Sequence, residues 1–166
     1  MKAYRVTDVD LPKIKAWIKR GKFNFSFKCW QRGLQIPPEA LLSRQDVYLF
    51  ALEDDNDNIK LVIYAEVRDK TVNKLDVNTA VNCYFLMADD ATKEDYKTLL
   101  KWILHYAYFK VECFKAEFWN LTEHAVWIQE LCSNNFCNVS DEIDTPIGKA
   151  VKVQINIKGA VEKWLS

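Results

Sequence analysis

Glycine is scarce in this sequence: only four of its 166 residues are glycine, and only two are histidine. Because so few glycines are available, no glycine-rich phosphate loop of the G-x-G-x-x-G or Walker type can be drawn. A surplus of charge is absent as well, since Lys plus Arg and Asp plus Glu both number 23. Proteins that coat nucleic acid usually carry excess cations that neutralise phosphates, so this balance disfavours nucleic acid as a partner.

Long apolar runs are also missing, and none approaches the ~20 residues that a membrane-spanning helix needs. The start of the chain is polar and contains no apolar core of an export signal. The five cysteines are odd in number and scattered, which without export favours reduced, mostly buried thiols. We therefore expect a cytoplasmic protein with no membrane partner.

The shortage of histidine limits metal binding and nucleophilic catalysis. His124, Cys132 and Cys137 are the one grouping that could suggest zinc, but they lack a fourth ligand and the short Cys-x2-Cys knuckle. No Ser-His-Asp or Cys-His-Asn signature is present. The sequence therefore predicts no metal site.

The chain contains enough apolar residues to form a hydrophobic core. Hydrophobic residues make up 49% of the chain and charged residues 28%, and a chain of this length buries roughly 70% of the surface that it exposes when unfolded. No linker or internal repeat interrupts it. We expect a single domain over residues 1–166.

Hydrophobic periodicity predicts both strands and helices. Strands are expected at 3–7, 47–52, 61–67, 80–87, 111–119, 136–139 and 150–157, and helices at 11–20, 37–42, 92–108 and 122–131. Residues 53–58 are rich in turn formers and indicate a hairpin-type connection. Hairpins join the strands in the middle of the chain, and helices alternate with strands in the second half. This combination predicts a mixed sheet with helices on both faces.

This order of elements, at this length, resembles the GNAT superfamily of N-acetyltransferases over nearly the whole chain. The resemblance is carried by the opening Tyr4-Arg5-Val6-Thr7-Asp8-Val9-Asp10-Leu11-Pro12, by the strand end Met87-Ala88-Asp89-Asp90, and by the helix from Thr122 with Asn134-Asn135-Phe136 after it. It implies an α/β (α+β) fold with a mixed, mostly antiparallel sheet flanked by about four helices. It also implies transfer of an acyl group, usually acetyl, from CoA to an amine.

By this resemblance the acyl-CoA would bind between two splayed parallel strands, at 82–87 and 115–119. Its pyrophosphate would meet the helix that begins at Thr92, where free N–H groups and the helix dipole favour an anion. The thioester carbonyl would be polarised by backbone N–H groups near Phe85, Leu86 and Met87. Asn120 stands where relatives often hold the pantetheine arm, and an ordinary turn asparagine is the alternative.

The chain departs from the family where the pyrophosphate would bind. The family pattern Q/R-x-x-G-x-G/A falls at 91–96, which reads Ala-Thr-Lys-Glu-Asp-Tyr here. Thr92 and Lys93 are the groups there that suit a phosphate, whereas Glu94 and Asp95 would repel one. Gln129 also stands where the family often has a tyrosine acid.

Two carboxylates and two tyrosines are candidates for proton transfer in the cleft that the resemblance implies. Glu117, or Glu66 at the end of another strand, would take a proton from the amine if burial raised its pKa, and a solvated charge at a strand end is the alternative. Tyr84 would protonate the departing thiolate, as would Tyr96, and packing in the core is the alternative for either ring.

Four aromatic residues form the most unusual local feature of the chain: Phe23, Phe25, Phe27 and Trp30. In the family, the segment between the first two helices often walls the acceptor site. An aromatic wall would favour an apolar or aromatic acceptor, or a protein partner. Rings that fill the core beneath the sheet are the alternative.

Two functions from different classes follow. The first is transfer of an acyl group from acetyl-CoA to a small-molecule amine or a protein acceptor. The second is a binding or regulatory module that keeps the fold, has lost CoA chemistry and holds a protein partner through residues 23–30. A divergent transferase that modifies a nucleobase is a third reading. An odd cysteine count and an open edge strand permit a homodimer.

Overall fold

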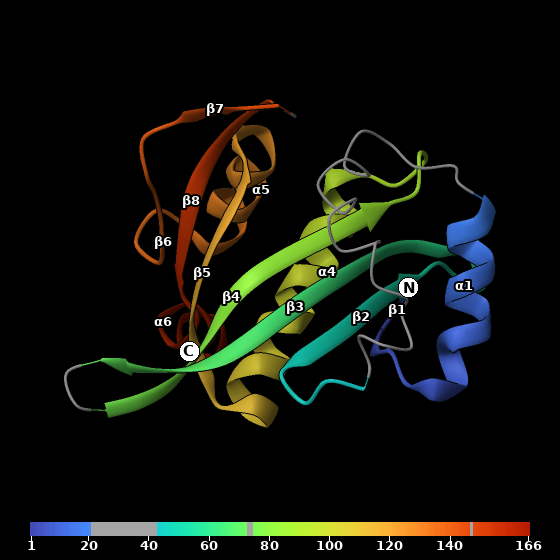
Figure 1. Ribbon diagram of the computed structural model, residues 1–166, viewed down its shortest axis with the longest axis horizontal. Helices are drawn as coiled ribbons and strands as arrows, with labels where there is room; N and C mark the ends of the chain where they lie inside the picture. Colours follow the sequence, from blue (N-terminus) through green and yellow to red (C-terminus); the bar gives the residue numbers. More distant parts are fainter. Residues whose placement is uncertain (21–42, 73–74, 147) are drawn as a thin grey trace. The chain divides into compact units, whose positions relative to one another are not determined.

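The computed structural model describes residues 1–20, 43–72, 75–146 and 148–166 (Figure 1). They group into a first unit, Met1–Ala65 with Tyr84–Leu99, and a second unit, Glu66–Cys83 with Leu100–Ser166. No helix within the described residues is long and apolar enough to cross a membrane.

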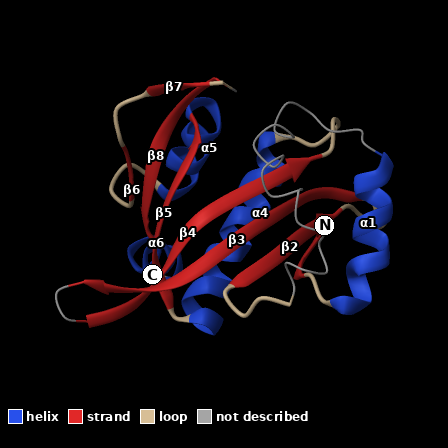
Figure 2. Ribbon diagram, viewed as in Figure 1, coloured by secondary structure: helices blue, strands red, loops and turns tan. Residues whose placement is uncertain are grey.

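The first unit carries the N-terminal strands and helix (Figure 2). Its elements are β1 (Lys2–Arg5), η1 (Asp8–Asp10), α1 (Leu11–Arg20), β2 (Val47–Glu53) and parts of β3 (Ile59–Val72), β4 (Leu75–Met87) and α4 (Lys93–Tyr106). The strand order is β1-β2-β3-β4, and β1 runs antiparallel to β2 with Tyr4 opposite Ala51. This part of the sheet is therefore built from strands that are consecutive in sequence.

The core of the first unit joins α1 to the sheet. Ile14 and Trp17, three positions apart on α1, are buried in one cluster with Leu49, Val62 and Leu86 of the strands. The helical spacing at 11–20 thus predicted both the helix and the face that it buries. The predicted hairpin at 53–58 is also confirmed, because Asp54 Oδ1 accepts hydrogen bonds of 2.9 Å from the backbone N–H groups of Asn56 and Asn58.

The second unit contains the rest of β3, β4 and α4, followed by the C-terminal elements. These are η3 (Ala107–Val111), β5 (Cys113–Leu121), α5 (Thr122–Cys132), β6 (Cys137–Val139), β7 (Ile143–Thr145), β8 (Gly148–Asn156) and α6 (Ile157–Leu165). The strand order is β3-β4-β5-β8-β6, and β7 also pairs with β8. Figure 1 shows α5 lying along β5 and β8, which it contacts.

The predicted fold class is confirmed. β5 runs parallel to β4, whereas its pairing with β8, and those of β6 and β7 with β8, are antiparallel, so the sheet is mixed and mostly antiparallel. Within the described residues the helices that accompany it are α1, α4, α5 and α6. The predicted helix at 37–42 lies outside those residues.

Several predicted boundaries differ from the structure. β1 covers 2–5 rather than 3–7. The α-helical part of α4 ends at Tyr106 and continues as a π-helix, η3, to Val111, where a strand was expected to begin. Glu112 then adopts a left-handed conformation with φ of 54°, and Asn78 Nδ2 donates a 3.1 Å hydrogen bond to the carbonyl of Val111. These two features end the helix and delay β5 to Cys113.

β7 and α6 were not predicted. α6 begins directly after β8 because the side chain of Asn156 accepts a 2.9 Å hydrogen bond from the backbone N–H of Gly159, which caps the helix. Ile157, Ala160 and Val161 are its buried residues. This three-and-four spacing was visible in the sequence, but the apolar run of β8 extends into it and masks the boundary.

Candidate functional site

The parallel pairing between β4 and β5 is short. It places Asn78 opposite Cys113 and Ala80 opposite Ala116, with a register shift after the first pair. Within the described residues this register ends at Ala80 and Ala116, although β5 continues, paired with β8, as far as Leu121 opposite Ala150. The resemblance implied two splayed parallel strands at 82–87 and 115–119, and the structure pairs these strands at 78–80 and 113–116, before that stretch of β4 begins.

β5 beyond this point presents two different faces. Ala116, Phe118 and Asn120 are buried, whereas Trp119 is 50% exposed. Asn120 lies on the strand, and its Oδ1 accepts a 2.9 Å hydrogen bond from the backbone N–H of Leu121. It is therefore not the ordinary turn asparagine offered as the alternative, and its contact with a pantetheine arm remains a prediction.

Glu117 forms an ion pair with Lys152 across the β5–β8 ladder. Its side chain is 24% exposed, so it is neither fully buried nor simply solvated. Trp119 lies opposite Lys152 in the same register. An incoming ammonium group would have to compete with Lys152 for this carboxylate.

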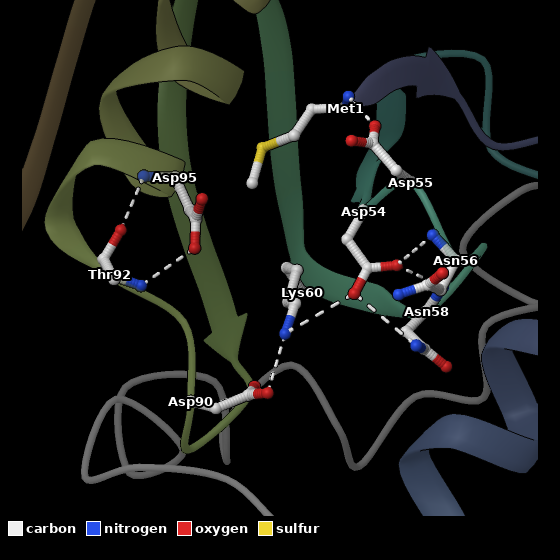
Figure 3. A network of polar contacts seen from close by, with 9 residues as sticks. All are labelled: Met1, Asp54, Asp55, Asn56, Asn58, Lys60, Asp90, Thr92 and Asp95. Atoms are coloured by element: carbon white, nitrogen blue, oxygen red, sulfur yellow. Dashed lines mark hydrogen bonds and ion pairs between the residues drawn. The ribbon is translucent and has the colours of Figure 1, made fainter.

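The N-terminus of α4 is closed by its own side chains (Figure 3). Thr92 Oγ1 accepts a 3.2 Å hydrogen bond from the backbone N–H of Asp95, and Asp95 Oδ2 accepts one of 2.9 Å from the backbone N–H of Thr92. This reciprocal pair is a capping box, with Asp at its third helical position. The predicted cap at Thr92 is confirmed. Its hydroxyl and the N–H group of Asp95 are used within the helix, however, so they do not fit a diphosphate.

Lys60 connects the β2–β3 turn to the loop before α4. Its Nζ lies 2.7 Å from Asp90 Oδ2 and 3.7 Å from Asp54 Oδ2 (Figure 3). The hydrogen bond to Asp90 raises the pKa of Lys60, burial opposes this, and the charges of Asp90, Asp54 and Asp95 add to the rise. This ammonium group is therefore already balanced by carboxylates of its own chain.

The residues at the end of β4 whose backbone N–H groups were expected to polarise the thioester carbonyl lie in the core of the first unit. Phe85, Leu86 and Met87 are at most 2% exposed. The ring of Phe85 lies against that of Tyr96, with 4.8 Å between centroids. Tyr96 is 3% exposed and packs against this ring, and its role as an acid stays a prediction.

The remaining predicted site residues can be placed only in part. Tyr84 lies on β4, but its side chain is outside the described part of the structure. Thr92 and Lys93 are exposed at the start of α4. The aromatic segment with Phe23, Phe25, Phe27 and Trp30 lies outside the described residues.

Glu53 and Glu66 are buried carboxylates that the fold brings against cations. Sequence reasoning missed Glu53, whereas it offered Glu66 as a second possible proton acceptor. Glu53, 5% exposed, accepts hydrogen bonds of 2.7 Å from the Tyr4 hydroxyl and 2.8 Å from Lys13 Nζ. Burial alone would raise the pKa of Glu53, but the bonds from Lys13 and Tyr4 outweigh it and hold this pKa below its ordinary value. Glu66, 4% exposed, is paired with Arg68, whose Nε lies 2.8 Å from Oε1. The partners of Glu53 come from 40 or more residues away in sequence, so no local pattern signals them.

His124, Cys132 and Cys137 behave as core residues. His124 is fully buried, and burial lowers its pKa from 6.5 to about 4. The described cysteines carry free thiols, and burial raises the pKa of Cys132 to about 12 and that of Cys137 to about 11. Among the described residues, no group of three or more His, Cys, Asp or Glu side chains could hold a metal ion.

Neither a protein-family model nor a curated protein sequence matches the chain. Solved structures of the spermidine N-acetyltransferase SpeG from Vibrio cholerae do match. One mutant of SpeG gives a TM-score of 0.62 at 11% identity and covers 99% of each chain. A crystal structure of the Vibrio cholerae spermidine N-acetyltransferase in complex with CoA and spermine gives a TM-score of 0.64 at 13% identity and covers 96% of this chain and 97% of that one. The chain thus has the fold of the GNAT superfamily.

Proposed function

We propose that this chain is an N-acyltransferase that moves an acyl group, acetyl first of all, from a CoA thioester to an amine. The supporting observation is the short β4–β5 pairing, which ends at Ala80 and Ala116. It occurs in a fold that matches SpeG over nearly the whole of both chains. A structure of SpeG contains CoA and spermine, the two kinds of ligand that such a reaction needs.

The proposed chemistry is direct attack of the amine on the thioester carbonyl, with both substrates bound together. A carbon–nitrogen bond forms, the carbon–sulfur bond breaks, the amine loses a proton and the departing thiolate gains one. Glu117 is proposed to accept the proton that the amine loses, once the amine has displaced Lys152 from this carboxylate. Tyr84 is proposed to donate the proton that the thiolate gains. Backbone N–H groups of Phe85, Leu86 and Met87 are proposed to polarise the carbonyl.

The acceptor is proposed to be a small-molecule amine or an amine of a protein, met by Phe23, Phe25, Phe27 and Trp30. The pantetheine arm of the donor is assigned to Asn120, at the end of β5 where the register with β4 has stopped. We further propose that residues 1–166 act as one domain in the cytoplasm, and the open edge strand permits a homodimer.

The test is a transfer assay with the purified chain, acetyl-CoA and a panel of amines that includes spermidine, spermine and lysine peptides. Release of free thiol, together with the mass of the acylated product, measures transfer. We expect thiol release that depends on both the chain and one class of amine. No transfer to any amine, with the chain folded by circular dichroism, would contradict the proposal.

The capping box at α4 favours a second candidate, a binding or regulatory module without CoA chemistry. Asp95 uses groups that a diphosphate would need. In that case Phe25→Ala or Trp30→Ala should abolish capture of a protein partner and leave the melting temperature unchanged. A fall in melting temperature would show that these rings fill the core.

A further inference from the structure

The start of α4 already holds an anion, and that anion is part of the helix. Asp95 is 7% exposed, and its carboxylate accepts the hydrogen bond of the Thr92 backbone N–H. The N–H of Asp95 in turn donates to the hydroxyl of Thr92. A helix N-terminus attracts anions through its unpaired N–H groups and its dipole, and here a carboxylate takes that place.

The charges around this helix start are also mostly negative. Asp89 and Asp90 precede it, and Glu94 lies in its first turn. Lys60 points toward Asp90 and Asp54, and its Nζ lies 2.7 Å from the first carboxylate and 3.7 Å from the second (Figure 3). A diphosphate placed here would meet carboxylates at short range, and repulsion between like charges is strong where water is partly excluded.

We propose that the acyl donor of this chain is recognised without its diphosphate, because the Thr92–Asp95 capping box closes the α4 N-terminus to phosphate. The donor class is then an acyl thioester of a pantetheine arm, to which a nucleotide adds no affinity. This inference deepens the proposed acyl transfer and rests on it. CoA qualifies as one member of the class, held by its arm alone.

The test compares CoA with pantetheine, which has the same arm and thiol but no nucleotide, by calorimetric titration of the purified chain. We expect the two dissociation constants to agree within about twofold. Asp95→Ala should tighten CoA binding by about tenfold, since it removes a charge next to the diphosphate, and should leave pantetheine binding unchanged. A chain that binds CoA ten times more tightly than pantetheine would overturn the inference.

Two further variants keep the result interpretable. Asp95→Asn keeps a hydrogen-bond acceptor of the same size and tests the charge even if Asp95→Ala fails to fold. Glu94→Gln removes the neighbouring carboxylate, which is exposed and outside the capping box, so it should tighten CoA binding clearly less than the Asp95 variants do. If Glu94→Gln tightens CoA as much as the Asp95 variants do, general charge and not the capping box excludes the diphosphate, and the inference is overturned.

Inorganic pyrophosphate separates this inference from the proposed function. Asp95→Ala, which opens the capping box, should gain a measurable affinity for pyrophosphate that the unmodified chain lacks, and Asp95→Asn, which removes only the charge, should gain a smaller one, whatever the chain catalyses. If pyrophosphate affinity is gained but the chain transfers no acyl group from acetyl-CoA or acetyl-pantetheine, the proposed transferase function is contradicted and the inference about the α4 N-terminus is supported. Transfer activity together with no gain in any Asp95 variant would uphold the transferase and overturn the inference.

Discussion

His124 shows how a single residue is governed by its surroundings. It is fully buried at the start of α5, its ring lies 4.9 Å from that of Trp127 between centroids, and burial lowers its pKa from 6.5 to about 4. A neutral imidazole is therefore favoured in the folded chain. The sequence offered His124 as an incomplete zinc ligand, because residue type alone does not report burial.

The depressed pKa of His124 predicts a loss of stability in mild acid. Above pH 6.5 the imidazole is neutral in both states and contributes nothing. As the pH falls from 6.5 towards about 4, the unfolded chain takes up the proton first, which costs the fold up to about 3 kcal/mol. Urea unfolding across this range should show a shallower pH dependence for His124→Gln than for the unmodified chain. Equal slopes would contradict the prediction.

Ser133 stores backbone strain at the end of α5. Its φ of 64° and ψ of 159° lie in a region that only glycine adopts readily. Ser133→Gly should therefore raise the free energy of unfolding by about 1 kcal/mol, measured by chemical denaturation. Ser133→Ala is the matched control and should give no gain, since alanine has the same steric restriction. A gain from alanine as well would show that the hydroxyl, and not the backbone, is the cause.

Glu117 carries the proposed deprotonation. Glu117→Gln keeps the shape of the side chain and removes its basicity, so turnover should fall at least tenfold, a lower bound set below the roughly hundredfold that positioned bases contribute at the least. The exposed Glu123 on α5 provides the control, because Glu123→Gln should leave turnover unchanged. An unchanged rate for Glu117→Gln would remove this residue from the mechanism.

At the scale of elements, α6 is positioned by a close approach at Gly159. A Cβ atom at this position would lie 2.6 Å from Phe136 Cδ1 and 2.9 Å from Asn156 Nδ2. The ring that precedes β6 therefore packs directly on the backbone of α6. The sequence shows a glycine inside an apolar helical pattern, but the residue that it accommodates is 23 positions away and cannot be read from local spacing.

This contact predicts that Gly159→Ala destabilises the chain. Alanine favours a helix over glycine by about 1 kcal/mol, but the clash with Phe136 should outweigh this and lower the free energy of unfolding by about 1–3 kcal/mol. In a Phe136→Ala background the same substitution should cost much less, which a double-mutant cycle measures. Additive effects would show that Phe136 is not the obstacle.

At the scale of the whole molecule, three elements run through both units. β3, β4 and α4 cross the boundaries at 65–66, 83–84 and 99–100. Elements shared in this way favour cooperative unfolding, because neither unit keeps its own strands and helix when the other unfolds. The single domain predicted over 1–166 is consistent with this but remains a prediction.

Thermal unfolding tests that prediction. Far-ultraviolet circular dichroism reports the helices and strands, and tryptophan fluorescence reports packing in both units, since Trp17 lies in the first and Trp164 in the second. The two curves should coincide with one midpoint. Different midpoints for the two signals would contradict the single domain and indicate two domains that unfold separately.

The sequence by itself determined the identity and order of most elements, because hydrophobic periodicity and caps act within a few residues. Helix α4 with its cap at Thr92, helix α5 and the hairpin at 53–58 follow from such local signals. The absence of glycine at 91–96 was equally visible, and it marked the place where the chain departs from the pyrophosphate pattern of the family that its sequence resembles.

Only the tertiary structure decided how distant residues meet. The end of the β4–β5 register, the pairing of Glu117 with Lys152 and the contact of Lys60 with Asp90 each join residues at least 30 positions apart. The sequence even predicted that Asp95 would repel a phosphate, but not that its carboxylate would turn back to cap its own helix. Such contacts depend on strand register and side-chain burial, which are set by the packing of the whole chain and not by local propensity.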